Sequence, residues 1–336
     1  MSKNYTTMDE LEEELGLKDK PFAKIGQQAE DIKKASFSFE EMQKHTVKEH
    51  EFIMHPILTK KSSMMIFGEA GVGKSYFTMN LAYSLSCGGN FLNYKVPYPQ
   101  KIAYFDGELG KDDVHRYIHD IAQFQGKTEF PGNLVFTSYD QFPNHHIPRI
   151  EDNTNSYFEY IMDNGFNGAV WDNLATCTDI DENDPKAWKP IQALVLRLRA
   201  HNVFVIFVHH SGSEKSKERG ITARRDVLQL VVSLEKIEDF ISLDNRIKVT
   251  YRKGRYLKGI DKQPFEAIHK IDGKWEMQTI EKSTYQAVVD CLLAGFTGAA
   301  TSKEVKISPG MVTRYKQQAI SEGKIKIYPN GRIVTQ

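Results

Sequence analysis

Short apolar segments alternate with helix-like segments between about residues 51 and 275, and this alternation predicts an α/β fold. Residues 203–208 are apolar throughout, which is typical of a strand buried on both faces of a sheet. We therefore expect a mostly parallel central sheet that is covered by helices on both sides. The expected strands are residues 64–67, 101–106, 134–137, 168–172, 202–208, 228–234 and 247–251.

The first 50 residues form a polar N-terminal arm that differs from this middle segment. Four apolar residues have the spacing of a short amphipathic helix: Met8, Leu11, Leu15 and Leu17. Such a helix is too short to fold alone, so it docks on the core, docks on a neighbouring subunit, or stays disordered. Three further apolar residues suggest that the chain rejoins a core: Phe37, Phe39 and Met42.

The last segment, residues 281–336, predicts three short helices followed by a hairpin. The expected helices are residues 287–293, 301–305 and 311–321, with Pro309 near the start of the third helix. Asn330 and Gly331 lie between the alternating residues 324–328 and 332–334, which is a strong hairpin signal. This order of elements is that of a small winged helix-turn-helix domain.

Charge separates the two ends of the chain. Lys and Arg together number 44, as do Asp and Glu, so a globally basic nucleic-acid-binding protein is excluded. Residues 281–336 carry eight basic side chains against four acidic ones, whereas residues 1–20 carry three against six. The C-terminal segment is therefore the better candidate for contact with a phosphate backbone.

The cysteines and the hydropathy pattern point to a cytoplasmic protein. Cys87, Cys177 and Cys291 are scattered and odd in number, which argues against a disulfide framework or a metal site. No run of 18 apolar residues is present, so we expect no membrane span. Residues 1–16 lack the apolar centre of a signal peptide.

Residues 68–75 match G-x-x-x-x-G-K-S, the phosphate-binding loop (P-loop) of nucleoside triphosphatases. The match follows an apolar run and opens a segment with helical spacing, as the motif requires. Lys74 is expected to contact the β- and γ-phosphates of ATP, and the Ser75 hydroxyl to hold Mg²⁺. The alternative is a glycine-rich turn without nucleotide. The expected nucleotide-binding residues are Gly68, Glu69, Ala70, Gly71, Val72, Gly73, Lys74, Ser75 and Tyr76.

Two carboxylates at strand ends are candidates for the hydrolysis of bound ATP and for the binding of Mg²⁺. Glu108 comes just after the expected strand 101–106, at the sheet edge where ligands bind, and is expected to polarise the attacking water. Asp172 ends an apolar run and is expected to hold Mg²⁺ through water, together with Ser75. The plainer alternatives are a surface carboxylate for Glu108 and, for Asp172, the cap of a helix or turn that begins at Asn173.

A histidine pair follows the buried strand 202–208. We expect His210, or His209 in its place, to contact the γ-phosphate and to report its loss to the next loop. A structural role or a zinc site is the alternative, although no Cys or carboxylate stands nearby at metal-ligand spacing. The polar loop 211–226 is either a DNA-contacting segment or a solvated loop; its cations are Lys215, Lys217, Arg219, Arg224 and Arg225.

Lys253 and Arg255 follow a late strand-like run. Residues i and i+2 of an extended chain share a face, so both cations point the same way. They are expected to reach the γ-phosphate bound by a neighbouring subunit, and the alternative is a basic surface patch at the sheet edge.

In this order, the motifs resemble RecA-like ATPases of the hexameric replicative helicase type, and most of all the RepA-like branch of plasmids and phages, which is related to DnaB. The resemblance covers about residues 37–275 and rests on residues 68–75, 106–108, 169–173 and 208–212. It implies a ring, usually of six subunits, with DNA in its central channel. It also implies these catalytic residues, of which the last two act on the adjacent subunit's ATP: Glu108, Lys74, His210, Lys253 and Arg255.

One departure from the RepA-like pattern leaves the trans-acting arginine open. Arg219 and Gly220 match that pattern, but Arg224 and Arg225 stand where apolar residues are expected. The arginine finger is therefore Arg255, Arg224 or Arg225.

The C-terminal segment carries a separate resemblance, to a winged helix-turn-helix. This resemblance implies that Thr313, Arg314 and Lys316 lie on a recognition helix and that Lys326 and Arg332 in the wing contact phosphates. A protein partner is the alternative to DNA.

Three functions fit these motifs. The first is an ATP-driven ring that moves on single-stranded DNA and unwinds duplex DNA, working with replication proteins. The second is a recombination or repair ATPase that binds DNA without unwinding it. The third is a nucleotide-gated DNA-binding regulator in which the winged helix is the working part.

Overall fold

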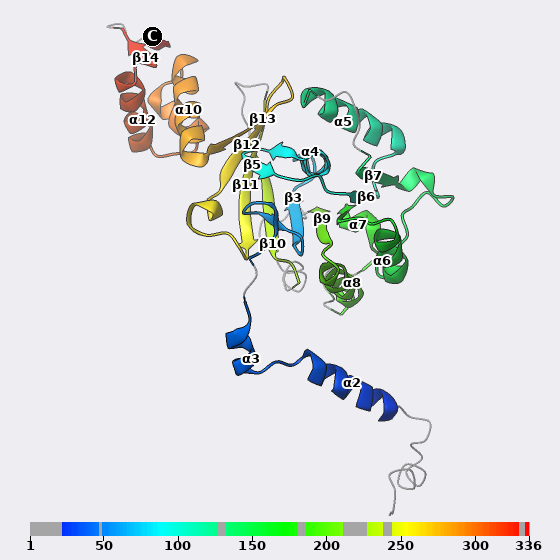
Figure 1. The fold of residues 1–336 in the computed structure, drawn as a ribbon. Helices are drawn as coiled ribbons and strands as arrows, with labels where there is room; N and C mark the ends of the chain where they lie inside the picture. The colour runs from blue at the N-terminus through cyan, green and yellow to red at the C-terminus, as the bar shows by residue number, and fades with distance from the viewer. Residues whose placement is uncertain are drawn as a thin grey trace, which may run out of the picture. The chain divides into compact units, whose positions relative to one another are not determined.

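The computed structural model describes residues 22–46, 49–126, 132–180, 184, 186–210, 227–237, 244–328 and 333–335 of the 336-residue chain (Figure 1). The chain divides into two compact units, Met1–His50 and Glu51–Gln336. None of the described helices is both long enough and apolar enough to span a membrane.

The first unit contains two helices, α2 (Phe22–Ala35) and α3 (Phe39–Lys44). Ser38 begins α3 with a capping box, in which its hydroxyl accepts from the Glu41 N–H and its own N–H donates to the Glu41 carboxylate. The three residues expected to rejoin a core are instead exposed, so that expectation was wrong: Phe37, Phe39 and Met42. The amphipathic helix expected around Met8, Leu11, Leu15 and Leu17 lies outside the described residues.

A nine-stranded sheet in the second unit confirms the α/β fold with a mostly parallel sheet. All seven expected strands are present, and six of them form a continuous parallel array in the order β10-β3-β9-β8-β6-β7. These six strands are β3 (Ser63–Gly68), β6 (Ile102–Asp106), β7 (Leu134–Ser138), β8 (Gly168–Asp172), β9 (Phe204–His210) and β10 (Leu230–Ile237).

Three antiparallel strands extend the sheet beyond β10, namely β11 (Asn245–Gly254), β12 (Phe265–His269) and β13 (Trp275–Thr279). The first was expected, but β12 and β13 were not. Each of the two has only five residues, and β12 carries the fully buried Glu266 as its second residue. A charged residue inside so short a strand hides the apolar pattern by which buried strands are recognised.

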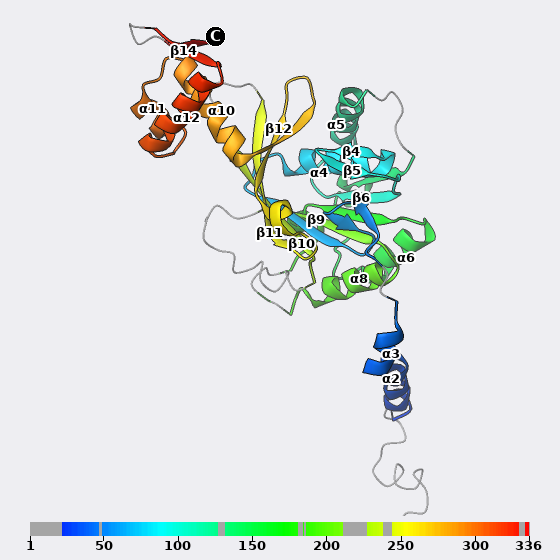
Figure 2. The ribbon, with the colours of Figure 1, turned by 60° about the vertical axis from the view of Figure 1, so that its left-hand side comes forward.

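Helices cover both faces of the sheet (Figure 2). Met64 and Ile66 of β3 pack in the core on one side, and Met65 and Phe67 pack on the other, as strand alternation requires. The first face is covered by α4 (Lys74–Cys87) and α5 (Lys111–Phe124), and the second by α6 (Thr154–Asp163), α7 (Leu174–Cys177) and α8 (Lys189–Ala200). The short elements are β1 (Phe52–Met54), β2 (Leu58–Thr59), β4 (Gly89–Phe91), β5 (Tyr94–Val96), η1 (Tyr139–Gln141) and η2 (Gly259–Lys262).

The C-terminal segment has three helices and two antiparallel strands, as its pattern predicted. These are α10 (Ile280–Leu293), α11 (Gly298–Glu304), α12 (Pro309–Ser321), β14 (Ile325–Ile327) and β15 (Ile333–Thr335). They enclose a small core of their own that includes Val288, Leu292, Tyr315, Ala319 and Ile325. The hairpin turn, with Arg332, lies outside the described residues. The winged-helix assignment stays a prediction.

A buried ion pair joins β11, β12 and α10. The Arg246 guanidinium donates to the Glu266 carboxylate and also to the Ser283 hydroxyl of α10, at 2.9 Å. The side chains of Arg246 and Glu266 are only 8% and 0% exposed. Removing one partner of such a pair leaves a buried charge without compensation.

A second buried carboxylate, Asp106, ends β6 and is 1% exposed. Its Oδ1 accepts from the N–H groups of Glu108 (3.0 Å) and Leu109 (2.7 Å), whereas Oδ2 has no hydrogen-bond partner among the described residues. Burial, with help from the nearby Asp172 carboxylate, raises the pKa of Asp106 to about 7. The Asp106 carboxyl group therefore binds its proton more tightly in the folded protein than in the unfolded chain.

Replacing Arg246 with Met is expected to lower the free energy of unfolding by about 3–5 kcal/mol, because Glu266 then stays buried without its cation. The matched control is Arg252→Met on the same strand, whose partner Glu235 is 45% exposed. That change is expected to cost under about 1 kcal/mol. Chemical denaturation measures both, and equal losses would contradict a structural role for the buried pair.

The Asp106→Asn variant is expected to gain stability over the wild type as the pH rises, with a clearly larger gain at pH 8 than at pH 5. Between the unfolded pKa and about 7, only the folded state holds the proton, so rising pH lowers the free energy of unfolding. The slope is at most about 1.4 kcal/mol per pH unit. Thermal midpoints without nucleotide test this, with Asp112→Asn on α5 as the exposed control. A stability change that is the same at both pH values would refute it.

Candidate functional site

The P-loop connects the end of β3 to the start of α4, and its glycines are required by the backbone. Gly71 and Gly73 have φ values of 76° and 90°, a left-handed conformation that other residues adopt only with strain. At Gly68 a side chain would place its Cβ 2.4 Å from the Leu234 carbonyl oxygen of β10. This loop ends at the N-terminus of a 14-residue helix, where N–H groups and the helix dipole favour an anion.

Lys74, the first residue of α4, lies against the loop. Its Nζ donates to the Glu69 carbonyl oxygen at 2.8 Å, and the residue is only 3% exposed. Burial lowers the pKa of Lys74, and the carboxylates of Asp172 and Glu108 act in the opposite direction. An ammonium group placed over a glycine-rich loop fits a phosphate ligand.

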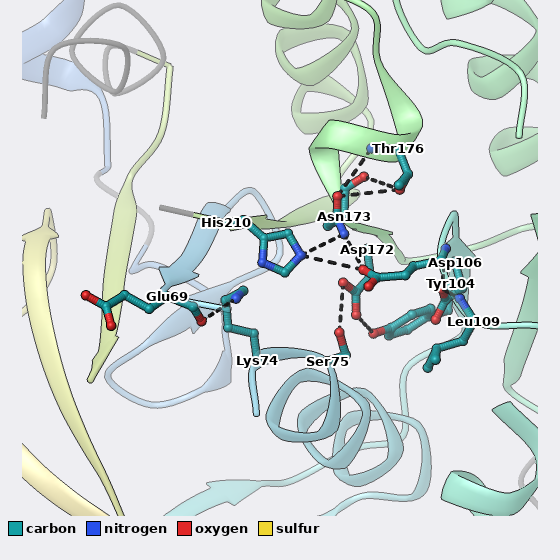
Figure 3. Close-up of polar contacts among 11 residues, drawn as sticks. Glu69, Lys74, Ser75, Tyr104, Asp106, Leu109, Asp172, Asn173, Thr176 and His210 are labelled. Atoms are coloured by element: carbon teal, nitrogen blue, oxygen red, sulfur yellow. Dashed lines mark hydrogen bonds and ion pairs between the residues drawn. The ribbon is translucent and has the colours of Figure 1, made fainter. Parts of the chain in front are cut away.

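Ser75 and Asp172 form the pair to which magnesium was assigned. The Ser75 hydroxyl donates to Asp172 Oδ1 at 3.2 Å, and the Tyr104 hydroxyl donates to Oδ2 at 2.6 Å (Figure 3). Burial raises the pKa of Asp172, while these two hydrogen bonds lower it.

The donor set of this pair fits Mg²⁺. Within the part of the chain that the structure describes, no group of three or more His, Cys, Asp or Glu side chains could hold a metal. Magnesium suits such a site because it keeps several waters and takes phosphate oxygens, so that Ser75 and Asp172 suffice as protein partners.

Glu108, Asn173 and His210 follow or end three different strands, and their side chains meet. Figure 3 shows Asn173 and His210 beside Asp172 and Ser75. Asn173 Nδ2 donates to Glu108 Oε2 at 2.6 Å and lies 2.9 Å from His210 Nε2. His210 Nε2 and Glu108 Oε2 are 3.5 Å apart. The Glu108 side chain is 55% exposed, so water can reach its carboxylate.

The structure distinguishes between the two histidines. His210 reaches the Glu108 and Asn173 side chains, whereas the preceding His209 is buried at 4% exposure. Tyr76, expected to contact nucleotide, packs its ring edge-on against His269 and Tyr117 at centroid distances of 5.0 and 5.8 Å. A nucleotide contact by Tyr76 stays a prediction.

Lys253 and Arg255 lie away from the other candidate residues. In the antiparallel pair β10–β11, Gly254 and Lys253 are opposite Leu230 and Val231, at the start of β10. The middle of β10 is the part that meets the P-loop, because Leu234, the fifth of its eight residues, pairs with Gly68. The two cations are therefore at the amino edge of the parallel strands, opposite the P-loop. The alternative fingers Arg224 and Arg225, with the whole loop 211–226, lie outside the described residues.

Three residues of this cluster had no assigned function in the sequence interpretation: Tyr104, Asp106 and Asn173. Asp106 and Asn173 stand next to assigned residues, and Asn173 was considered only as the start of a helix. It is indeed the N-cap of α7, where its Oδ1 accepts from the Thr176 N–H at 3.2 Å. Tyr104 could have been identified because it is a polar residue within a strand that is buried on both faces.

Comparison with known proteins identifies the family. A model of the AAA domain family (AAA_25) matches residues 28–216, which is more than half of the chain. No curated protein matches significantly.

Among solved structures, the KaiC-like protein PH0186 from the hyperthermophilic archaeon Pyrococcus horikoshii OT3 is similar with a TM-score of 0.48. The alignment has 12% identity and covers 70% of this chain and 99% of that one. The family match includes the P-loop, Glu108, Asp172 and His210. Because the family model covers more than half of the chain, the chain belongs to the AAA domain family.

Proposed function

We propose that the protein is a ring-forming DNA motor that hydrolyses ATP, of the replicative helicase type found in phages and plasmids. The observation that carries this proposal is the distribution of charge between the two sheet edges. Lys74, Asp172 and Glu108 gather at the carboxyl edge, whereas Lys253 and Arg255 lie at the amino edge. A second copy of the chain would have to bring these cations to the phosphates.

Each residue of the carboxyl edge has a task that matches its environment. Lys74 binds the β- and γ-phosphates, and Ser75 with Asp172 holds Mg²⁺, which neutralises charge on the phosphate oxygens. Glu108 accepts a hydrogen bond from the attacking water and orients it, and His210 contacts the γ-phosphate. The half-exposed Glu108 carboxylate supports this division, because the attacking water needs access to it. The Asp172 carboxylate lies against the Ser75 hydroxyl, where the two would hold Mg²⁺ together.

The same geometry supports a trans role for Arg255. Arg255 is exposed, and its backbone N–H is fixed by the Gln229 carbonyl oxygen at 3.0 Å. A guanidinium on a short, anchored segment at a sheet edge can enter a neighbouring site without reorganising its own subunit. Such a cation stabilises the charge that develops on the transferred phosphoryl group.

Contact with DNA is supported by the C-terminal segment. Helix α12 contains no Asp or Glu and exposes Thr313 and Arg314, while Lys316 is half-buried. Lys326 on β14 is exposed as well. These exposed basic side chains suit a phosphate backbone, although Glu322, which ends α12, pairs with Lys324 beside them.

Wild-type protein is expected to hydrolyse ATP faster with single-stranded DNA and to displace an annealed strand. Glu108→Gln should lower kcat about 10²–10⁴-fold, because the amide cannot accept the proton of the attacking water. ATP binding should be retained, in contrast to Lys74→Ala. Asp112→Asn, an exposed change on α5, is the control. ATPase activity without strand displacement would favour the recombination ATPase, and full cellular function of Glu108→Gln would favour the regulator.

Mixing two inactive variants tests whether the site is shared. Lys74→Ala lacks nucleotide binding but keeps Arg255, while Arg255→Ala keeps the P-loop. A random equal mixture contains intact interfaces at about a quarter of positions, so ATPase activity should recover to about that fraction of the wild type. If the mixture stays as inactive as its components, Arg255 does not act in trans, and Arg224 and Arg225 become the variants to mix.

A further inference from the structure

Asn173 is held in one orientation by the start of helix α7. Its side chain is almost fully buried, at 2% exposure for the residue. Oδ1 accepts from the Thr176 N–H at 3.2 Å, and a swapped amide would place two donors against each other there. The Nδ2 group therefore faces the site, where it meets both Glu108 and His210 (Figure 3).

This orientation determines which nitrogen of His210 carries the proton. An amide NH₂ only donates, so His210 Nε2, at 2.9 Å from it, must accept. The neutral ring then carries its proton on Nδ1, which is buried and has no hydrogen-bond partner among the described residues. In Figure 3 this nitrogen is on the side of the ring that faces Lys74.

The contact between His210 and Glu108 agrees with this assignment. Their atoms are 3.5 Å apart, which is longer than either contact with Asn173. A proton on Nε2 would point at the Asn173 amide or at Glu108, and in the first case two donors would oppose each other. The two shorter contacts share the two hydrogens of one amide, one for the carboxylate and one for the imidazole.

We propose that Asn173 is a positioning residue for ATP hydrolysis, whose single amide group holds the Glu108 carboxylate and fixes the His210 tautomer. This inference rests on the proposed ATPase function. It joins the side chain that orients the attacking water to the side chain that contacts the γ-phosphate. The imidazole presents an N–H, not a lone pair, to the phosphate side. A displacement of His210 would shift the Asn173 amide and, through it, the Glu108 carboxylate.

Two substitutions separate this role from helix capping. Asn173→Ser retains a good N-cap, because its hydroxyl accepts from the Thr176 N–H, but it is too short to reach both partners. Asn173→Asp keeps the size and the cap and replaces the two donors by an oxygen. The matched control is Asn153→Ser at the start of α6, where the amide donates to the Arg149 carbonyl oxygen away from the site.

Steady-state kinetics give the first measurement. Both Asn173 variants are expected to lower kcat about 100-fold, while KM for ATP changes less than about threefold. Adding Asn173→Ser to Glu108→Gln should cost clearly less than the about 100-fold loss of Asn173→Ser alone, because the part that acts through the carboxylate is already lost and only the effect on His210 remains. Thermal midpoints of Asn173→Ser and Asn153→Ser should be similar. Retention of kcat within about twofold, or an equal loss of ATP binding, would overturn the proposal.

The ¹⁵N NMR spectrum of the His210 ring gives a measurement that needs no turnover. The full-length wild type is expected to show protonated Nδ1 and unprotonated Nε2, and Asn173→Ser to show exchange between the two tautomers. An unchanged tautomer in the variant would overturn the positioning role. If the wild type hydrolyses no ATP, the proposed function fails, and the spectrum still decides the role of Asn173 by itself.

Discussion

The register of the parallel strands is the constraint on which the site depends. Gly68 at the end of β3 pairs with His210 of β9, and Asp106 at the end of β6 pairs with Asp172 of β8. Side chains alternate between the two faces of a strand, so a shift of either pair by one residue would turn these groups away from each other. Helices on both faces fix the register, because every strand residue from Met64 to Phe67 is buried on one side or the other.

This register also forces two carboxylates into a buried position. Asp106 and Asp172 are each 1% exposed, and burial raises the pKa of both. Hydroxyl donors stabilise the Asp172 carboxylate, and backbone N–H groups stabilise that of Asp106. In the proposed site, Mg²⁺ would offset the negative charge that the protein alone compensates only in part.

The sequence alone predicted correctly those parts of the structure in which a local residue pattern is compatible with only one backbone geometry. The pattern of residues 68–75 predicted a loop between a strand and a helix, and the apolar run 203–208 predicted a strand buried on both faces; both were confirmed. Strands β12 and β13 were missed because Glu266 is buried through Arg246, a partner 20 residues away that no local pattern reveals. The exposed Phe37, Phe39 and Met42 show the converse error, because apolar spacing alone does not say that a partner surface is present. Asn173 was missed as a positioning residue because its two contacts come from β6 and β9, far from it in the chain.

The separation of charges between the two sheet edges restricts the assemblies that could complete the site. Lys253 pairs with Val231 and the Arg255 N–H donates to the Gln229 carbonyl oxygen before β10, whereas Gly68 pairs with Leu234 further along the strand. The cations therefore lie toward the amino ends of the parallel strands, away from the P-loop of the same chain. A contact that brings the amino edge of one copy to the carboxyl edge of the next joins two different surfaces. Such heterologous contacts repeat in one direction and end only in a closed ring or continue as a filament. Each copy in the interior of such an array both receives a cation and supplies one, and hydrolysis at one site is then tied to the position of the neighbouring subunit.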